Sequence, residues 1–192
     1  DENGEAAFVA REAGSLVARG TPADEIAVLY RANFQSRALE EAFLREGVPY
    51  QVLGVRFFER REVKDTFAHL RASMNPESVA DFTRAIQAPP RGIGKVTLAK
   101  VAMKREHELP DAARKKVADF RKSLAEIARV IETKKASDAV RATLAESGLA
   151  RLYGRGGAEE AERLENLKEL VTVASKYAAL PPPEGIERLI EE

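Results

Sequence analysis

The most informative segment of this chain comprises residues 26–50, IAVLYRANFQSRALEEAFLREGVPY. Residues 26–29 form a short apolar run with β-branched side chains, a pattern typical of a buried strand. The spacing then changes to that of a helix, in which Asn33 is placed to cap the first turn and Gly47 to end the last. The segment therefore predicts a strand, a turn and a helix, followed by a second strand over residues 50–53 and a tight turn at Gly54.

Tyr30 and Arg31 come directly after the first predicted strand. In α/β units, the residues just past the carboxyl end of a strand lie at the ligand crevice. An aromatic ring beside a guanidinium group can hold a purine and a phosphate. The pattern alone leaves an alternative open, in which Tyr30 is a core residue at the strand end and Arg31 is a surface charge.

Composition excludes several classes of function. The sequence has no cysteine, which rules out disulfides and thiolate chemistry. Its two histidines, His69 and His107, are isolated and have no metal-ligand spacing, and we expect His69 on a helix surface and no metal site. No apolar run reaches membrane-spanning length and no signal pattern opens the chain, so we expect a cytoplasmic protein without membrane contact.

The charge balance limits how the chain could bind nucleic acid. With 31 basic and 31 acidic residues, no global field attracts DNA, so any DNA contact has to be local. Pairs of basic residues such as Lys115-Lys116 lie among acidic residues on predicted helices. We interpret them as solvated helix faces.

Outside residues 26–53, helical spacing dominates. A helix is predicted over residues 4–19 and another through Val63, Phe67, Leu70 and Met74. Beyond Asn75-Pro76 only helical patterns remain, over residues 79–86, 96–108, 111–135 and 137–148. Two series of apolar residues spaced three or four apart, here called seams, predict packing in a helix bundle. They are Val117, Phe120, Leu124, Ile127 and Ile131, then Leu164, Leu167, Val171, Ala174 and Tyr177. The predicted fold is α/β over residues 1–74 and all-α over residues 75–192, mostly α overall.

Three sequence segments, in this order along the chain, resemble segments of a known protein family: residues 26–50, RFFERREVKD at 56–65 and PPRGIG at 89–94. They resemble the second RecA-like domain of superfamily 1A DNA helicases of the UvrD/Rep/PcrA group, and RLENLKEL at 163–170 extends the match. The resemblance implies a fragment of a RecA-like (P-loop NTPase) domain. Residues 1–74 would form part of its subdomain 2A, and residues 75–192 most of its helical subdomain 2B, truncated at the C-terminus.

The resemblance also implies an activity for the parent protein. That parent would be an ATP-dependent DNA helicase moving 3′ to 5′ in repair or replication. Tyr30 and Arg31 match motif IV, where the tyrosine stacks on adenine and the arginine acts catalytically on the γ-phosphate, facing the first RecA-like domain. ATP and Mg²⁺ would be cofactors of the parent only. The sequence contains neither a phosphate loop nor an acidic strand-end pair, so the chain alone should bind neither and hydrolyse no ATP.

The PPRGIG phrase predicts a hairpin between two helices, the element that contacts DNA in helix-hairpin-helix proteins. Its glycines expose backbone N–H groups and the next helix presents its N-terminus, so a phosphate oxygen can lie against both. The candidate DNA-binding residues are Arg91, Gly92, Ile93, Gly94, Lys95 and Thr97. The alternative is a tight turn whose Ile93 plugs the core, and the two interpretations are compatible. The expected partner is DNA at a single-strand/duplex junction, bound without sequence preference.

Two rival functions stay open at this point. One is a non-enzymatic helical module that binds a protein through its seams. The other is a piece of a helicase-nuclease of the same superfamily. A longer reading frame with a phosphate loop upstream and an arginine-rich motif downstream would favour the helicase over the module.

Overall fold

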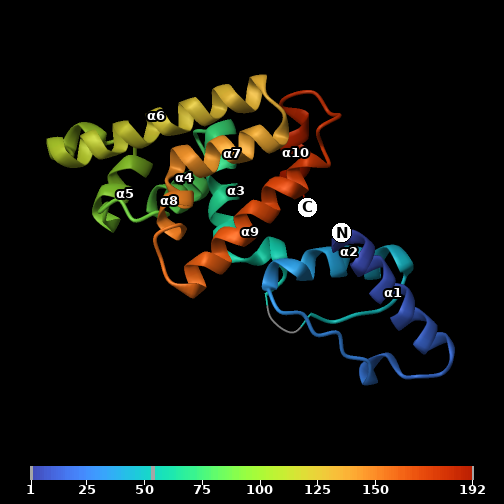
Figure 1. The fold of residues 1–192 in the computed structure, drawn as a ribbon. Coiled ribbons are helices and arrows are strands. Elements are labelled where there is room, and N and C mark those ends of the chain that lie inside the picture. The colour runs from blue at the N-terminus through green and yellow to red at the C-terminus, as the bar shows by residue number, and fades with distance from the viewer. Residues whose placement is uncertain (1, 53–54, 192) are drawn as a thin grey trace. The chain divides into compact units, whose positions relative to one another are not determined.

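The computed structural model describes residues 2–52 and 55–191. The chain divides into two compact units, Asp1–Arg60 and Arg61–Glu192. Regular secondary structure in the described ranges is entirely helical (Figure 1). The α-helices are α1 Glu2–Ala18, α2 Ser36–Glu46, α3 Arg61–Met74, α4 Val79–Gln87, α5 Lys95–Ala102, α6 Asp111–Thr133, α7 Ala136–Ser147, α8 Leu149–Tyr153, α9 Ala158–Ser175 and α10 Glu184–Ile190.

The first unit is built on α1 and α2, which pack against each other. Their shared core consists of small side chains and one ring: Ala6, Ala10, Ala13, Ala38, Ala42 and Phe43. Alanine at these positions lets the two helices approach closely. Both helices end where the sequence predicts, since Gly20 has φ +101° and Gly47 has φ +68° in the left-handed region that favours glycine.

The predicted α/β fold is wrong, because the described residues contain no strand or sheet. Residues 26–29 keep part of the expected pattern: Ile26 is extended, with φ −102° and ψ 123°, and Ile26 and Val28 pack on the α1/α2 core. Leu29 instead is 92% exposed. A strand exists only through hydrogen bonds to a neighbouring strand, and the described part of the chain offers this segment none. Of the second predicted strand, Leu53 lies outside the described residues, as does the turn at Gly54.

The second unit confirms the helical part of the prediction. Helix α3 packs against α4, α6, α7 and α9, and most of its side chains are buried. The buried face of α6 consists of the five residues of its predicted seam. In helix α9 the buried face differs from the predicted one. Leu167 and Ala174 are buried as expected, but Leu170 and Val173 are buried instead of Leu164 and Val171. The contacts of α9 with α3 and α7 determine which of its faces is buried.

Two boundaries differ from the sequence expectation. The helix predicted over residues 96–108 stops at Ala102, because Lys104 adopts φ +59° and a separate 3-10 helix follows at Glu106–Glu108. Along the chain, the boundary between the two compact units lies between Arg60 and Arg61, whereas the change in sequence character falls at Asn75. The reason is that α3, which precedes Asn75, packs with α4 and the other helices of the second unit.

Candidate functional site

Tyr30 and Arg31 end the extended segment that crosses the first unit. Tyr30 is 36% exposed and lines a hollow of about 720 Å³ formed by α1, α2, the segment itself and residues 48–52. Arg31 is exposed, does not line the hollow and forms no ion pair within the described ranges. The ring is therefore available for stacking at the rim of a cavity, while the guanidinium next to it is free to meet an anion.

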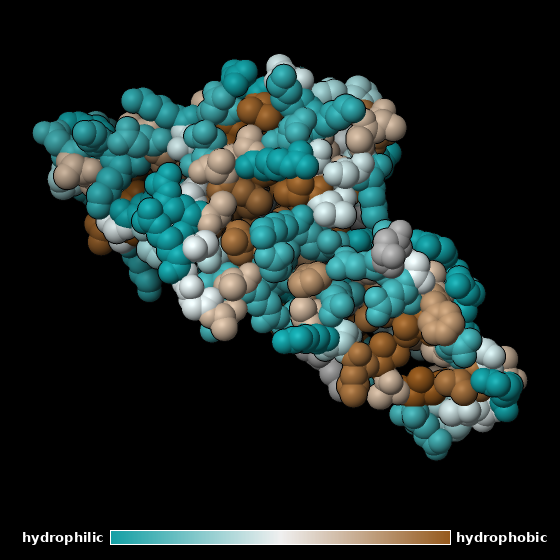
Figure 2. All heavy atoms as spheres, in the orientation of Figure 1, coloured by the Kyte–Doolittle hydropathy of each residue, from teal (hydrophilic) through white to brown (hydrophobic). Residues whose placement is uncertain are grey.

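The first unit carries an exposed apolar surface, to which Leu29 of this hollow contributes. Figure 2 shows hydrophobic side chains gathered on the first unit, where Phe8, Leu29 and Leu44 are each more than half exposed. Besides its apolar side chains the hollow is lined by two carboxylates, Asp24 and Glu40, and by the uncharged polar residues Asn33, Ser36, Gln51 and Tyr50. Such a cavity suits a flat apolar ring with a polar edge better than it suits a highly charged group.

Arg60 is a residue of this region whose role the sequence did not reveal. It is 7% exposed, and its Nη2 donates hydrogen bonds to the carbonyl oxygen of Asn33, at 2.6 Å, and to Ser36 Oγ, at 2.8 Å. Its guanidinium also lies over the Phe57 ring, 5.5 Å from the centroid. Arg60, in the RFFERR segment, therefore braces the turn that follows Tyr30 and Arg31. The sequence signal for this contact was that the segments 26–50 and 56–65 occur together in the chain.

The start of α2 is stabilised within the same turn. The Ala32 N–H donates to Gln35 Oε1 at 3.0 Å, and Arg37 donates to Glu41 at 2.7 Å from a buried position. Gln35 occupies the N-cap position of α2, whereas Asn33, the predicted cap, lies in the preceding 3-10 helix. Gln35 and Arg37 thus position the turn.

The predicted hairpin joins α4 to α5 and is open to solvent. Gly92 has φ +64°, a conformation that favours glycine, and Gly94 is the N-cap residue of α5. No side chain caps that helix start, and a Cβ built on Gly94 meets nothing within 4 Å. The first N–H groups of α5 thus have no side-chain acceptor among the described residues, and Gly94, Lys95 and Val96 are exposed. Ile93 and Thr97 are half-buried and Lys95 is exposed, so the core-plug and phosphate-binding interpretations remain compatible.

Lys116 of α6 reaches the hairpin from outside it. Its Nζ lies 3.4 Å from the carbonyl oxygen of Gly92 and 3.0 Å from the position a Cβ on Gly92 would take. Neither Lys116 nor Lys95 forms an ion pair with any carboxylate in the part of the chain that the structure describes. The sequence had indicated only a solvated face here, because the approach of α6 to the hairpin is a tertiary contact.

Arg91 points inward, contrary to its expected place beside a phosphate. Its Nη1 donates to the carbonyl oxygens of Ala85, Ile86 and Pro89, at 3.1, 3.1 and 2.9 Å. Its Nη2 donates to the Ser147 carbonyl at 2.8 Å. The guanidinium lies 4.7 Å from the centroid of the Phe120 ring, and burial lowers its pKa below the usual value. A guanidinium stays charged in proteins, so this cation is held by carbonyls and a ring.

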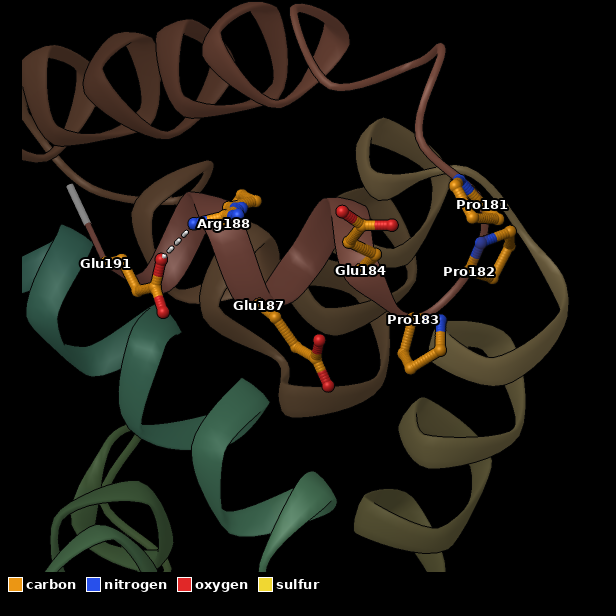
Figure 3. Close-up of a pocket in the computed structure, with 7 residues that line it drawn as sticks. All are labelled: Pro181, Pro182, Pro183, Glu184, Glu187, Arg188 and Glu191. Atoms are coloured by element: carbon orange, nitrogen blue, oxygen red, sulfur yellow. Dashed lines mark hydrogen bonds and ion pairs between the residues drawn. The ribbon is translucent and has the colours of Figure 1, made fainter.

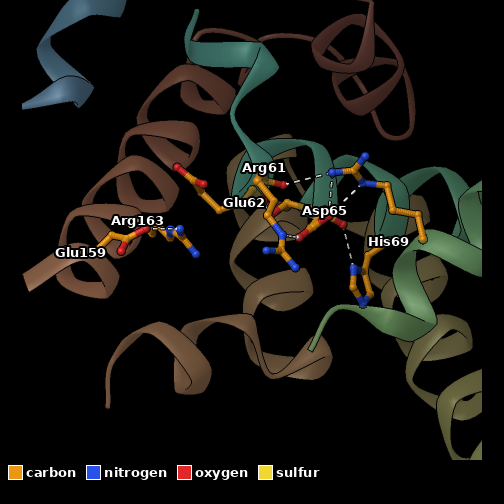
Figure 4. A network of polar contacts seen from close by, with 8 residues as sticks. Arg61, Glu62, Asp65, His69, Glu159 and Arg163 are labelled. Atoms are coloured by element: carbon orange, nitrogen blue, oxygen red, sulfur yellow. Dashed lines mark hydrogen bonds and ion pairs between the residues drawn. The ribbon is translucent and has the colours of Figure 1, made fainter. Parts of the chain in front are cut away.

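Buried polar side chains of α3 pair with residues of neighbouring helices in the second unit, and Figure 4 shows the contacts around Asp65. Asn166 Nδ2 donates to Glu62 Oε1 at 2.6 Å, and Arg84 Nε donates to Asp65 Oδ1 at 2.8 Å. Burial raises the pKa of Asp65 above its usual value, although Arg84 acts in the opposite direction. These contacts join α3 to α4 and α9, which indicates a structural role.

His69 belongs to the same set of contacts, so its predicted surface position is wrong. It is fully buried on α3, its Nδ1 lies 2.8 Å from the Asp65 carbonyl oxygen, and its ring meets Phe120 edge-on. Burial lowers the pKa of His69 to about 4. A neutral ring therefore sits in the core.

A second hollow, of about 560 Å³, lies at the start of α10 (Figure 3). Its lining is Pro181, Pro182, Pro183, Glu184, Glu187, Arg188 and Glu191. Arg188 donates to Glu191 at 3.1 Å. Across residues 2–52 and 55–191, no three acidic or histidine side chains are placed to bind a metal ion. None of the described helices has the length and apolar character needed to cross a bilayer.

The candidate residues fall into two groups. Tyr30, Arg31 and the brace from Arg60 belong to the first unit, and the hairpin with Lys116 belongs to the second. Each group offers cationic or N–H donors to an anion, and the first adds an aromatic ring. The expected chemistry is nucleotide binding for one group and phosphate binding for the other.

Comparison with known proteins identifies the family of the chain. The family model for the UvrD-like helicase C-terminal domain matches residues 1–192. DNA helicase II of Haemophilus influenzae is 35% identical over 100% of this chain and 28% of its own length. ATP-dependent DNA helicase UvrD1 of Mycobacterium tuberculosis (strain ATCC 25618 / H37Rv) is 35% identical over 93% of the chain and 26% of its own length. ATP-dependent DNA helicase PcrA of Bacillus subtilis is 41% identical over 53% of the chain and 14% of its own length.

The chain thus spans roughly a quarter of the first two of these relatives. The match to the family model covers both groups of candidate residues, together with the phrases on which the resemblance rested. The chain belongs to the UvrD-like helicase C-terminal domain family.

Proposed function

We propose that this chain is the part of an ATP-dependent DNA helicase that supplies motif IV and a helical DNA-binding subdomain. Residues 1–74 would correspond to subdomain 2A and residues 75–192 to subdomain 2B. The substrate would be a single-strand/duplex junction, unwound with 3′ to 5′ movement in the cytoplasm. The relatives are DNA helicases by name, which supports the DNA substrate.

The open hairpin carries the DNA-binding part of the proposal. Gly94 leaves the start of α5 uncovered, and the helix dipole places partial positive charge there. Lys95 and Lys116 add two cations without competing carboxylates among the described residues. Donors of this kind bind the DNA backbone and not the base edges, so affinity should depend on salt and not on sequence.

Motif IV would supply part of a nucleotide site. Tyr30 at the rim of its hollow fits an adenine ring, and Arg31 fits a phosphate group. The sequence has no phosphate loop to hold the β- and γ-phosphates and Mg²⁺. These residues would therefore act together with another part of the helicase, and ATP and Mg²⁺ would bind only to that assembly.

Fluorescence anisotropy of a labelled duplex across a salt series tests the hairpin. We expect weak binding to the 192-residue chain, with the logarithm of the affinity falling against log salt at a slope of roughly −2. Lys95→Ala and Lys116→Ala should each flatten this slope by about one, equally for duplexes of different sequence.

Lys134→Ala is the matched control. Lys134 is also an exposed lysine without an ion pair in the described part of the chain, and it follows the far end of α6. At about 1.5 Å per residue along that helix, it lies about 27 Å from Lys116. Its removal should leave the slope unchanged. Equal slopes for the wild type and the Lys95→Ala/Lys116→Ala double variant would exclude the hairpin as the DNA contact.

A further inference from the structure

The Arg91 side chain donates hydrogen bonds to the C-terminal ends of two helices. Ala85 and Ile86 belong to the last turn of α4, and Ser147 is the last residue of α7. The final carbonyl groups of a helix lack partners within that helix and carry partial negative charge. One guanidinium therefore satisfies carbonyls from two converging helix ends, at 2.8 to 3.1 Å. Such a position stabilises a cation without any carboxylate.

A third helix holds the guanidinium from its flat side. Phe120 is 2% exposed on α6, and the Arg91 guanidinium carbon lies 4.7 Å from the centroid of its ring. The planar group thus donates from its edge to α4 and α7 and contacts α6 through its face. Lysine could not replace it, because an ammonium group has no flat face and no fixed fork of donors.

The contacts of Arg91 determine where the hairpin lies. Its backbone directly precedes Gly92, and its Nη1 also donates to the Pro89 carbonyl at 2.9 Å, which ties the hairpin to its own side chain. Among the described residues, every hydrogen bond of the guanidinium goes to a backbone carbonyl. Across this described part of the chain, only the Nε–H and one N–H of Nη2 are not engaged in this way.

We infer that Arg91 is a positioning residue, which fixes the Gly92–Ile93–Gly94 hairpin against α4, α6 and α7 and does not itself meet DNA. The inference rests on the proposed function, since it concerns how the proposed DNA contact is held. It departs from the sequence expectation, in which Arg91 neutralised a phosphate. The N–H groups of the hairpin, Lys95 and Lys116 would make the contact, and Arg91 would hold the hairpin at the required geometry.

The salt dependence of duplex binding separates the two roles. Arg91→Lys keeps the charge and Arg91→Gln removes it, and both lose the fork of donors. If Arg91 positions the hairpin, both variants should weaken binding on the order of tenfold at every salt concentration, with the slope of the wild type. Lys95→Ala, which removes a proposed phosphate contact, should flatten the slope by about one. Measurements are made well below the melting temperature of each variant, so that only folded chain is compared.

Two results would overturn the inference. If Arg91→Lys binds like the wild type while Arg91→Gln flattens the slope by about one, then Arg91 neutralises a phosphate. If both variants melt at lower temperature but bind DNA like the wild type, then Arg91 serves stability only.

If the wild-type chain binds no duplex, the proposed function is refuted but the inference about Arg91 is not. Hydrogen exchange then tests the inference. The backbone amide of Leu98, which donates to the Gly94 carbonyl oxygen at 3.1 Å, should exchange severalfold faster in Arg91→Lys and Arg91→Gln than in the wild type, and at the wild-type rate in Lys95→Ala. Unchanged exchange at this amide would show that Arg91 does not position the hairpin.

Discussion

At the scale of single residues, His69 gives the clearest pH dependence. Its pKa is lowered to about 4 by burial, and the positive charge of Arg91 acts in the same direction. In the unfolded chain its pKa is about 6.5, so the unfolded state binds the proton more readily. The stability contributed by the neutral ring is complete above pH 6.5 and is lost as the pH falls from 6.5 toward 4.

We therefore expect the wild type to lose about 2 kcal/mol more stability between pH 7 and pH 5 than His69→Gln does. Urea unfolding followed by circular dichroism measures the difference. His107, with 76% of its side chain accessible, provides the comparison, since His107→Gln keeps the buried His69 and should keep the loss that His69 causes. Parallel pH curves for the wild type and His69→Gln would show that His69 can be protonated in the folded chain.

At the scale of elements, the hydrogen bond between Glu62 and Asn166 couples α3 to α9. Both residues are almost fully buried, at 4% and 3% exposure, and the donor and acceptor are 2.6 Å apart. Removing Asn166 leaves a buried carboxylate without this donor, which costs more than removing both partners. A double-mutant cycle of Glu62→Ala and Asn166→Ala should give a coupling energy of about 2 kcal/mol in urea unfolding.

A surface pair on α9 provides the comparison. Lys168 and Glu165 lie 2.6 Å apart but are 61% and 46% exposed. Solvent screens such a pair, and the same cycle should return less than about 0.5 kcal/mol. Similar coupling energies for the two pairs would mean that the α3–α9 contact does not depend on the buried hydrogen bond.

At the scale of the whole molecule, the prediction concerns ATP. The 192-residue chain should release no phosphate from ATP with or without DNA, because it has no phosphate loop. In the complete helicase, Arg31→Ala should lower kcat on the order of a thousandfold with little effect on nucleotide binding, while Tyr30→Ala should raise KM. Steady-state phosphate release measures both, and Arg45→Ala, an exposed arginine on α2, is the control. Normal turnover by Arg31→Ala would refute the role proposed for motif IV.

Local pattern was sufficient to predict most of the helices and one complete packing face. The spacing of Val117, Phe120, Leu124, Ile127 and Ile131 predicted the buried side of α6, because helical periodicity is a property of neighbouring residues. Glycines marked the ends of α1, α2 and α7 for the same reason, since a left-handed φ is a local requirement. The order of the family segments along the chain likewise indicated the helicase family from the sequence alone.

Tertiary structure alone decided the absence of strands and the burial of the key polar side chains. Residues 26–29 have the composition of a strand, but pairing needs a second strand, and the described residues supply none. The partners of Arg91 and Glu62 lie up to 56 and 104 residues away, at Ser147 and Asn166. A polar group is stable in a core only when its partners arrive from other elements, so its burial cannot be inferred from its sequence neighbours.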